Sequence, residues 1–249
     1  MEQLDPLLKG TRIGPTVVGF LDLLGVSQRV VEQGLGDLLT IYEQGWLSQE
    51  EVRLVYAAHG VFESQRVDKF MFSDSVLFFS QWSSITNLAT TVAVTAGTMM
   101  AYLLNDMTAS RGVIALGDMG INLERHIFVG LPLVQTAAVE RELDANCLVF
   151  ITPDSPSDVV ELLTKVGWLS NFPVPLKENA RKRLQVFGVH PESLRMIRYF
   201  NAEDHADGHL AACLRACRLL VTRADGRARI LLENGLSFLE QEAGSTGEE

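Results

Sequence analysis

The chain has 249 residues, 47% of them hydrophobic, which is enough for the core of one large α/β domain or of one domain with an appendage. Its net charge of −10 argues against a general nucleic-acid binder, although a nucleotide site needs only a few local cations. The apolar runs are interrupted too often to span a bilayer, residues 1–5 lack a signal-peptide pattern, and there are only three cysteines. Together with the charge, these features lead us to expect a cytoplasmic protein with no membrane or nucleic-acid partner.

Strand and helix patterns alternate along the chain. Residues 16–24 are rich in Val, Leu and Phe, which predicts a buried strand, and apolar residues at helical spacing follow from Gly25. The segment 117–120 has the composition of a turn, and Glu178-Asn179 is the predicted turn of a final hairpin. The predicted strands are 16–24, 67–72, 76–79, 111–116, 121–129, 147–151, 174–177 and 183–189, and the predicted helices are 25–39, 47–58, 85–104, 130–143, 157–165, 205–222 and 227–241.

Paired strands with helices between them predict an α/β sandwich, of the α+β kind, with a mixed and mainly antiparallel sheet. We expect one domain over residues 1–190 and a C-terminal helical extension over 191–241. The remaining 242–249 are rich in Gly, Ser and Glu and are predicted to be a disordered tail.

Two carboxylates stand alone among large apolar residues. Asp22 ends the first predicted strand, and Asp74 lies in the short turn between the second and third. A buried carboxylate is costly unless a cation or hydrogen-bond donors meet it, so the pair suggests a shared divalent-metal site to which the Leu23 carbonyl could contribute. The alternative is that Asp22 caps the following helix and Asp74 simply occupies a turn.

Positive residues gather in one short stretch, which contains Lys177, Arg181, Lys182 and Arg183. Contact with a phosphate group and a solvated hairpin explain this stretch equally well.

Four motifs in chain order resemble the class III nucleotidyl cyclases. FLDLLG at 20–25 and FSDS at 72–75 look like the two metal-aspartate motifs of that family. RGVIALGD at 111–118 resembles its arginine-led strand, and GLPLVQTAAVERE at 130–142 is similar to the helix that follows. The resemblance covers residue 16 to about residue 190 and is strongest to the bacterial Pycsar uridylate and cytidylate cyclases. It implies a ferredoxin-like class III cyclase fold, with the cyclase-like catalytic domain at 1–190.

The resemblance also implies roles for single residues. Asp22 and Asp74 would bind two Mg²⁺ or Mn²⁺ ions with help from the Leu23 carbonyl. Arg111 would contact phosphate, which suits a guanidinium, although pairing with Asp118 or Glu124 is a competing explanation.

Lys177 in PLKEN is similar to a triphosphate-contacting lysine of the family, but Glu178 replaces the usual glycine. For the base, Phe70 takes the position of a purine-reading lysine or glutamate, and it could lie against a pyrimidine ring or be ordinary core. Phe20 is a second candidate for substrate contact, and Lys69 is an alternative base-reading residue.

The helix departs from the family pattern. Val134 and Ala138 stand where purine cyclases carry an asparagine and a transition-state arginine, and neither can stabilise charge. Gln135 is the only nearby amide and Glu140 the nearest acid. Another cation substitutes, such as Arg111 or the basic stretch, or else the protein is slow or inactive.

The function implied by the resemblance is conversion of UTP, or as second choice CTP, to the 3′,5′-cyclic monophosphate and pyrophosphate. The family's sites lie between two wrapped domains, which implies a head-to-tail homodimer. The relatives act in anti-phage defence through an effector that senses the cyclic nucleotide. The alternative is a catalytically lapsed, dimeric nucleotide-binding or signalling module of the same fold.

Overall fold

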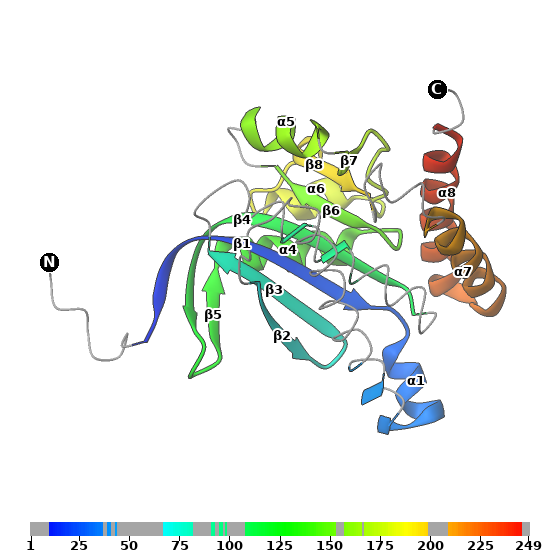
Figure 1. The fold of residues 1–249 in the computed structure, drawn as a ribbon, viewed down its shortest axis with the longest axis horizontal. Coiled ribbons are helices and arrows are strands. Elements are labelled where there is room, and N and C mark those ends of the chain that lie inside the picture. Colours follow the sequence, from blue (N-terminus) through cyan, green and yellow to red (C-terminus); the bar gives the residue numbers. More distant parts are fainter. Residues whose placement is uncertain are drawn as a thin grey trace, which may run out of the picture.

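The computed structural model describes residues 10–36, 39–40, 43, 67–81, 91–92, 95–96, 98, 108–152, 157–165, 167–198 and 209–245. A single curved sheet runs through this part of the chain (Figure 1), with strand order β2-β3-β1-β4-β6-β8-β7 and β5 paired to β4. The strands are β1 (Arg12–Leu23), β2 (Asp68–Phe72), β3 (Ser75–Gln81), β4 (Ser110–Asn122), β5 (Ile127–Gly130), β6 (Leu148–Ile151), β7 (Leu169–Ser170) and β8 (Leu194–Ile197). The helices are α1 (Val26–Gln33), α4 (Leu131–Glu142), α5 (Ser157–Lys165), α6 (Ala180–Gln185), the 3₁₀ turn η2 (Pro191–Ser193), α7 (His209–Arg223) and α8 (Gly226–Ser245).

Among these strands the β4–β6 pair is parallel and the other pairs are antiparallel. The predicted α/β architecture with a mixed, mainly antiparallel sheet is therefore confirmed. None of the helices in the described ranges combines the length and apolarity that a bilayer crossing requires.

The two long central strands define the faces of the sheet. β1 and β4 pair along twelve residues, from Arg12 opposite Ile121 to Leu23 opposite Ser110. Helix α4 covers one face near Gly117, where an added Cβ would lie 2.8 Å from Pro132 Cγ. The other face meets the buried helical residue Thr91, which shares a 2.8 Å hydrogen bond with Ser80 of β3. Side chains of cross-strand partners point to the same face, so the register decides which residues share the α4 side.

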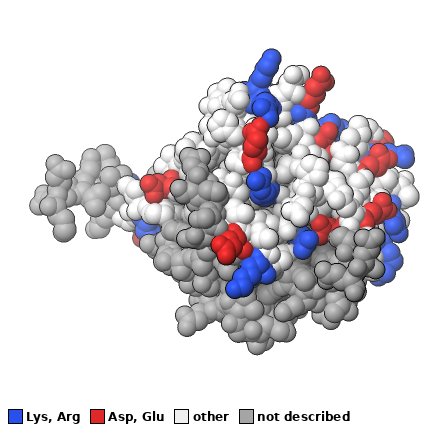
Figure 2. Space-filling view, turned by 90° about the horizontal axis from the view of Figure 1, so that it is seen from above, with Lys and Arg blue, Asp and Glu red and all other residues white. Residues whose placement is uncertain are grey.

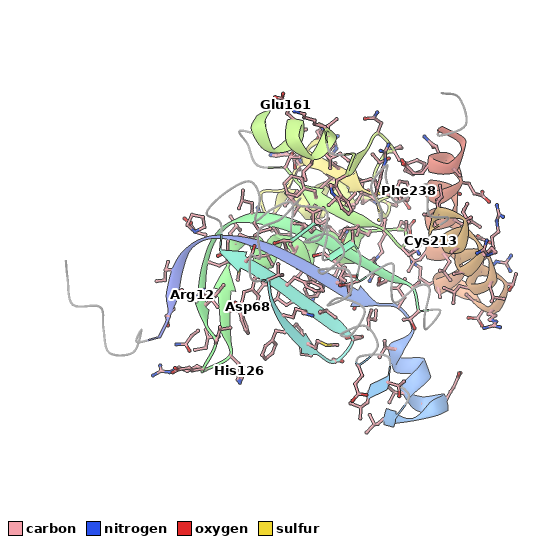
Figure 3. All side chains as sticks on the ribbon, in the orientation of Figure 1. Arg12, Asp68, His126, Glu161, Cys213 and Phe238 are labelled. Atoms are coloured by element: carbon pink, nitrogen blue, oxygen red, sulfur yellow. The ribbon has the colours of Figure 1, made fainter. Side chains whose placement is uncertain are left out.

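Helices α7 and α8 form an antiparallel hairpin beside the β7–β8 end of the sheet (Figure 1). Cys213 of α7 and Phe238 of α8 point inward (Figure 3) and belong to the same buried cluster as Leu148 of β6. Phe238 packs edge-on against Phe172, with ring centroids 5.6 Å apart. Glu242 near the end of α8 accepts a 2.6 Å hydrogen bond from Ser170 Oγ. The hairpin thus shares the core of the sheet.

Two predictions about single elements are wrong. Residues 117–120 are not a turn but part of β4, and the turn occupies 123–126. Their glycines allow close packing, because Pro132 lies over Gly117 and Val129 over Gly120. The predicted hairpin over 174–189 is also absent. Residues 180–185 form helix α6 instead, whose Ala180 and Leu184 are buried one turn apart.

Other elements differ in their presence or bounds from those predicted. Strand β8 was not predicted, although it lies between β6 and β7, so the sheet continues to Ile197. Helix α8 runs to Ser245, past the end at 241 expected from sequence. The predicted helix at 47–58 and most of that at 85–104 lie outside the described residues.

Candidate functional site

Asp22 and Asp74 lie at neighbouring strand ends. Asp22 is opposite Ser75 of β3 and Arg111 of β4, on the face that α4 covers. The Leu23 N–H donates a 2.8 Å hydrogen bond to the Asp74 carbonyl, which fixes the β2–β3 turn to the end of β1. Helix α1 has Gly25 at its N-cap and no side-chain capping bond, so Asp22 does not cap it.

Arg111 links the acidic groups around it. Its Nη2 lies 3.5 Å from Asp22 Oδ2, its Nε forms an ion pair with Glu140 and its Nη1 donates to the Leu143 carbonyl at 3.5 Å. The side chains of Arg111, Asp22 and Glu140 are only 15%, 21% and 7% exposed. Arg111 therefore pairs with Asp22 and Glu140 rather than with Asp118 or Glu124.

The charges around Asp22 do not balance. Burial, together with the negative charges of Glu140 and Asp74, raises the pKa of Asp22 to about 7 against the opposing effect of the Arg111 guanidinium. Carboxylates held together with this much uncompensated negative charge are suited to a hard divalent cation. The described residues contain no group of three or more His, Cys, Asp and Glu arranged around a metal. Mg²⁺ is commonly held by one or two carboxylates and substrate phosphates, and Asp22, Asp74 and the Leu23 carbonyl fit that pattern.

Glu140 belongs to this group although the sequence assigned it no role. Helix α4 buries Thr136, Val139 and Glu140 on one side, and the acid thereby reaches Arg111. The signal in the sequence was a glutamate at helical spacing with buried positions, which charged residues rarely occupy without a partner.

Lys177 lies at the edge of the same group. Its backbone N–H donates to the Glu142 carbonyl at 2.9 Å, and its Nζ donates to the Arg141 carbonyl. Burial lowers the pKa of Lys177, and the positive charges of Arg111 and Arg227 lower it further.

The two arginines of the basic stretch, Arg181 and Arg183, are paired with glutamates. Arg183 forms two hydrogen bonds to Glu142, at 2.7 and 2.5 Å, and Arg181 pairs with Glu192. The face shown in Figure 2 likewise intersperses charges of both signs among the described residues. Lys177 lies close enough to Arg111 for the charge of the guanidinium to lower the pKa of the lysine.

The aromatic candidates lie on the Asp22 face, and Lys69 does not. Phe20 and Phe70 share a row through Leu77, and Phe70 packs against Phe128 with ring centroids 5.1 Å apart. Lys69 is opposite Phe78 and so lies on the other face of the sheet.

Helix α4 carries the remaining candidates. Val134 is 48% exposed and Ala138 is half-buried. Gln135 donates a 3.1 Å hydrogen bond to the Phe187 carbonyl, so its amide is already engaged.

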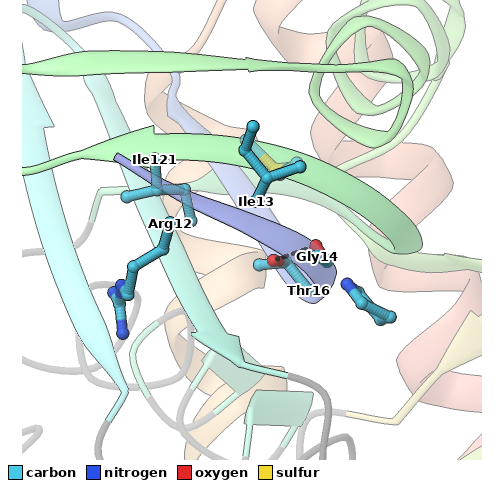
Figure 4. Close-up of a pocket in the computed structure, with 7 residues that line it drawn as sticks. Arg12, Ile13, Gly14, Thr16 and Ile121 are labelled. Atoms are coloured by element: carbon cyan, nitrogen blue, oxygen red, sulfur yellow. Dashed lines mark hydrogen bonds between the residues drawn. The ribbon is translucent and has the colours of Figure 1, made fainter. Parts of the chain in front are cut away.

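Two cavities lie away from the acidic group. One of about 30 Å³ sits at the start of β1 between Ile13, Thr16 and Ile121 (Figure 4), at the opposite end of the strand from Asp22. Arg12 beside it pairs with Asp68 of β2 at 3.5 Å (Figure 3). A second, of about 410 Å³, is lined by Phe172, Leu176, Arg181, Leu194 and Arg195, among others. Neither is lined by Asp22, Asp74 or Arg111.

No protein-family model matches the chain, and no curated protein matches it. Among solved structures, the adenylyl cyclase CyaB from P. aeruginosa is 13% identical over 75% of this chain and 95% of its own, with a TM-score of 0.49. The catalytic core of a rhodopsin-guanylyl cyclase with converted specificity, in complex with ATPαS, is 12% identical over 76% and 97%, with a TM-score of 0.48. A bacterial light-regulated adenylyl cyclase is 13% identical over 71% and 96%, with a TM-score of 0.42. At TM-scores below 0.5 these likenesses carry no argument about function, which has to come from the residues.

Proposed function

We propose that the chain is a nucleotidyl cyclase that acts on a pyrimidine nucleoside triphosphate, UTP first and CTP second. The observation that carries the proposal is the meeting of Asp22, Asp74 and Arg111 at one end of the sheet, with Glu140 beside them. Carboxylates for divalent ions and a guanidinium for phosphate are what a triphosphate requires. The motifs that resemble class III cyclases supply these same residues.

In the proposed mechanism, Asp22, Asp74 and the Leu23 carbonyl would hold two Mg²⁺ or Mn²⁺ ions. Such ions, when bound, activate the ribose 3′-hydroxyl and neutralise the phosphates as pyrophosphate leaves. Arg111 orients the phosphates, and Lys177 adds positive charge beside it. Phe20 and Phe70 offer apolar surface on the same face for the base.

The proposed assembly is a homodimer with sites at the interface. Val129, Leu131 and Val134 expose large apolar side chains near the start of α4, which favours contact with a second protomer. The proposed setting is cytoplasmic anti-phage defence, in which a cyclic-nucleotide-sensing effector responds to the product.

A second candidate is a lapsed module that binds nucleotide without turnover. Two observations favour it. Arg111 is already engaged by Asp22 and Glu140, and Val134 and Ala138 cannot stabilise transition-state charge.

The test incubates the full chain with each of the four nucleoside triphosphates and Mn²⁺ or Mg²⁺, and analyses products by mass spectrometry. We expect cyclic UMP or cyclic CMP, no product from Asp74→Ala, and unchanged turnover in the control Asp118→Ala, whose side chain is exposed on β4. No cyclic product from any nucleotide would overturn the cyclase proposal, and nucleotide binding without product would support the lapsed module.

A further inference from the structure

Residues 143–147 form a loop between α4 and β6 that contacts β4 at two points. The Leu143 carbonyl accepts the 3.5 Å hydrogen bond from Arg111 Nη1. The Cys147 carbonyl accepts a 2.8 Å hydrogen bond from the Gly112 N–H. The position of this loop therefore affects both the guanidinium of Arg111 and the backbone next to it.

Helix α8 holds the middle of this loop. The Asn146 N–H donates to the Leu231 carbonyl at 3.1 Å, and the Asn234 side-chain amide donates to the Asp144 carbonyl. Arg227 in the first turn of α8 forms an ion pair with the Asp144 carboxylate. These three contacts come from successive turns of one helix.

Gly235 lets α8 approach the loop closely. A Cβ at Gly235 would overlap the Asn146 side chain and would lie 2.8 Å from the Asn146 carbonyl oxygen. A Cβ at Gly244, on the same helix, would meet nothing within 4 Å. The absence of a side chain at 235 is thus needed for this contact, whereas at 244 it is not.

The far side of the loop is also held. The Asp144 N–H donates to the Pro175 carbonyl at 2.9 Å, and Leu143 forms a bridge with Leu176, next to Lys177. Ala145, Asn146 and Cys147 are buried. The loop is therefore held between α8 on one side and residues 175–176 on the other.

We infer that helix α8 is a positioning element for Arg111, acting through the loop 143–147. The inference rests on the phosphate role proposed for Arg111. Arg227, Asn234 and Gly235 are positioning residues, because they act on the guanidinium through Asp144, Asn146 and Leu143. A shift of α8 against the loop moves the Leu143 carbonyl, which accepts a hydrogen bond from Arg111, and so changes the orientation of the guanidinium toward the triphosphate.

The experiment compares two matched pairs in the full chain. Arg227→Ala removes the contact to the loop, whereas Arg229→Ala removes an exposed pair with Glu233 within α8. Gly235→Ala and Gly244→Ala change helix propensity alike, but only the first meets the loop. We expect Arg227→Ala and Gly235→Ala to lower kcat by about 10-fold to about 100-fold with little change in KM, and both controls to keep wild-type turnover. Arg227→Lys should recover part of the loss.

Two readouts separate positioning from a general structural role. In an Arg111→Lys background, Arg227→Ala should cost little further activity, because both changes act on the same group. Hydrogen exchange at the amides of Gly112 and Asn146 should quicken in Arg227→Ala and Gly235→Ala but not in the controls.

The exchange measurement does not depend on turnover. A wild-type chain that makes no cyclic nucleotide would contradict the proposed function. The effect of α8 on β4 would still be measured by hydrogen exchange at the Gly112 amide. Unchanged exchange at Gly112 and Asn146 in both Arg227→Ala and Gly235→Ala would overturn the inference. Equal losses from Arg227→Ala with and without Arg111 would overturn it as well.

Discussion

The acidic group around Arg111 shows how single side chains set the chemistry of the site. Asp22, Asp74 and Glu140 come from β1, the β2–β3 turn and α4, and one guanidinium serves the first and the third. Burial of Asp22, followed by the charge of Glu140, outweighs Arg111 in its effect on the pKa. The group of side chains around Asp22 therefore carries an excess of negative charge, and two predictions test this.

The first prediction concerns pH. The pKa of Asp22 is about 7 in the folded chain against 3.8 for the free side chain, so the folded chain binds more protons between these values. The free energy of unfolding should therefore fall as pH rises from about 4 to about 7, by at most on the order of 4 kcal/mol from this group, and level off above. Asp22→Asn removes this loss of stability. In urea unfolding with EDTA present, the free energy of unfolding of the variant should therefore rise relative to that of the wild type as the pH increases. A difference that stays constant with pH would contradict the assignment.

The second prediction concerns Glu140. Below about pH 7, where Asp22 is largely protonated, Glu140 is the carboxylate partner of the buried Arg111, so Glu140→Gln should lower the free energy of unfolding there by about 1–3 kcal/mol. It should also lower the pKa of Asp22, because the charge of Glu140 helps to raise it. Urea unfolding measures the first effect, and the pH dependence of stability measures the second. The control Glu233→Gln loses only an exposed pair with Arg229 and should change stability by less than about 0.5 kcal/mol. Equal effects from the two variants would argue against a buried role for Glu140.

At the scale of elements, composition misled where glycine serves packing. Gly117 and Gly120 suggested a turn, but their missing side chains make room for Pro132 and Val129. Helix α6 was taken for a strand because a six-residue segment carries little periodic signal. Strand β8 was missed because it is also short. Its four residues, Leu194–Ile197, form a strand only by pairing with β6 and β7.

The third prediction tests this packing of α4 on β4. Gly117→Ala places a Cβ 2.8 Å from Pro132 Cγ and should destabilise the chain by about 1–3 kcal/mol through overpacking. Gly36→Ala meets nothing within 4 Å and serves as the control. Thermal or urea unfolding of both variants gives the answer. A neutral Gly117→Ala would mean that this glycine is not required for the contact.

At the scale of the whole molecule, the C-terminal helices and the sheet share one core. Cys147 precedes β6, while Cys213 and Cys217 lie on α7, and the three thiols are fully enclosed in a single cluster. Burial raises the pKa of Cys147 and Cys213 to about 12 and that of Cys217 to about 11. We therefore propose that residues 191–241 are an integral part of the folding unit rather than a separable extension.

The fourth prediction follows from this shared core. In the native chain none of the three thiols should react with a disulfide reagent near neutral pH, because each is buried and protonated. With rising denaturant, Cys147 and the α7 pair should become reactive over the same transition, as expected for a single cooperative unit. Peptide mapping of the labelled sites distinguishes them. Earlier labelling of Cys213 and Cys217 would show that the hairpin unfolds on its own.

The local chemistry of the sequence determined much of this protein. The apolar pattern of β1, the 157–165 helix and the placement of Asp22 and Asp74 at strand ends all follow from short-range periodicity and turn composition. Only the tertiary structure decided which side chains from other elements contact these elements and residues. Glu140 reaches Arg111, and α8 reaches the loop beside it, through contacts between residues far apart in the chain. Such contacts depend on strand register and helix packing, for which no local pattern carries a signal.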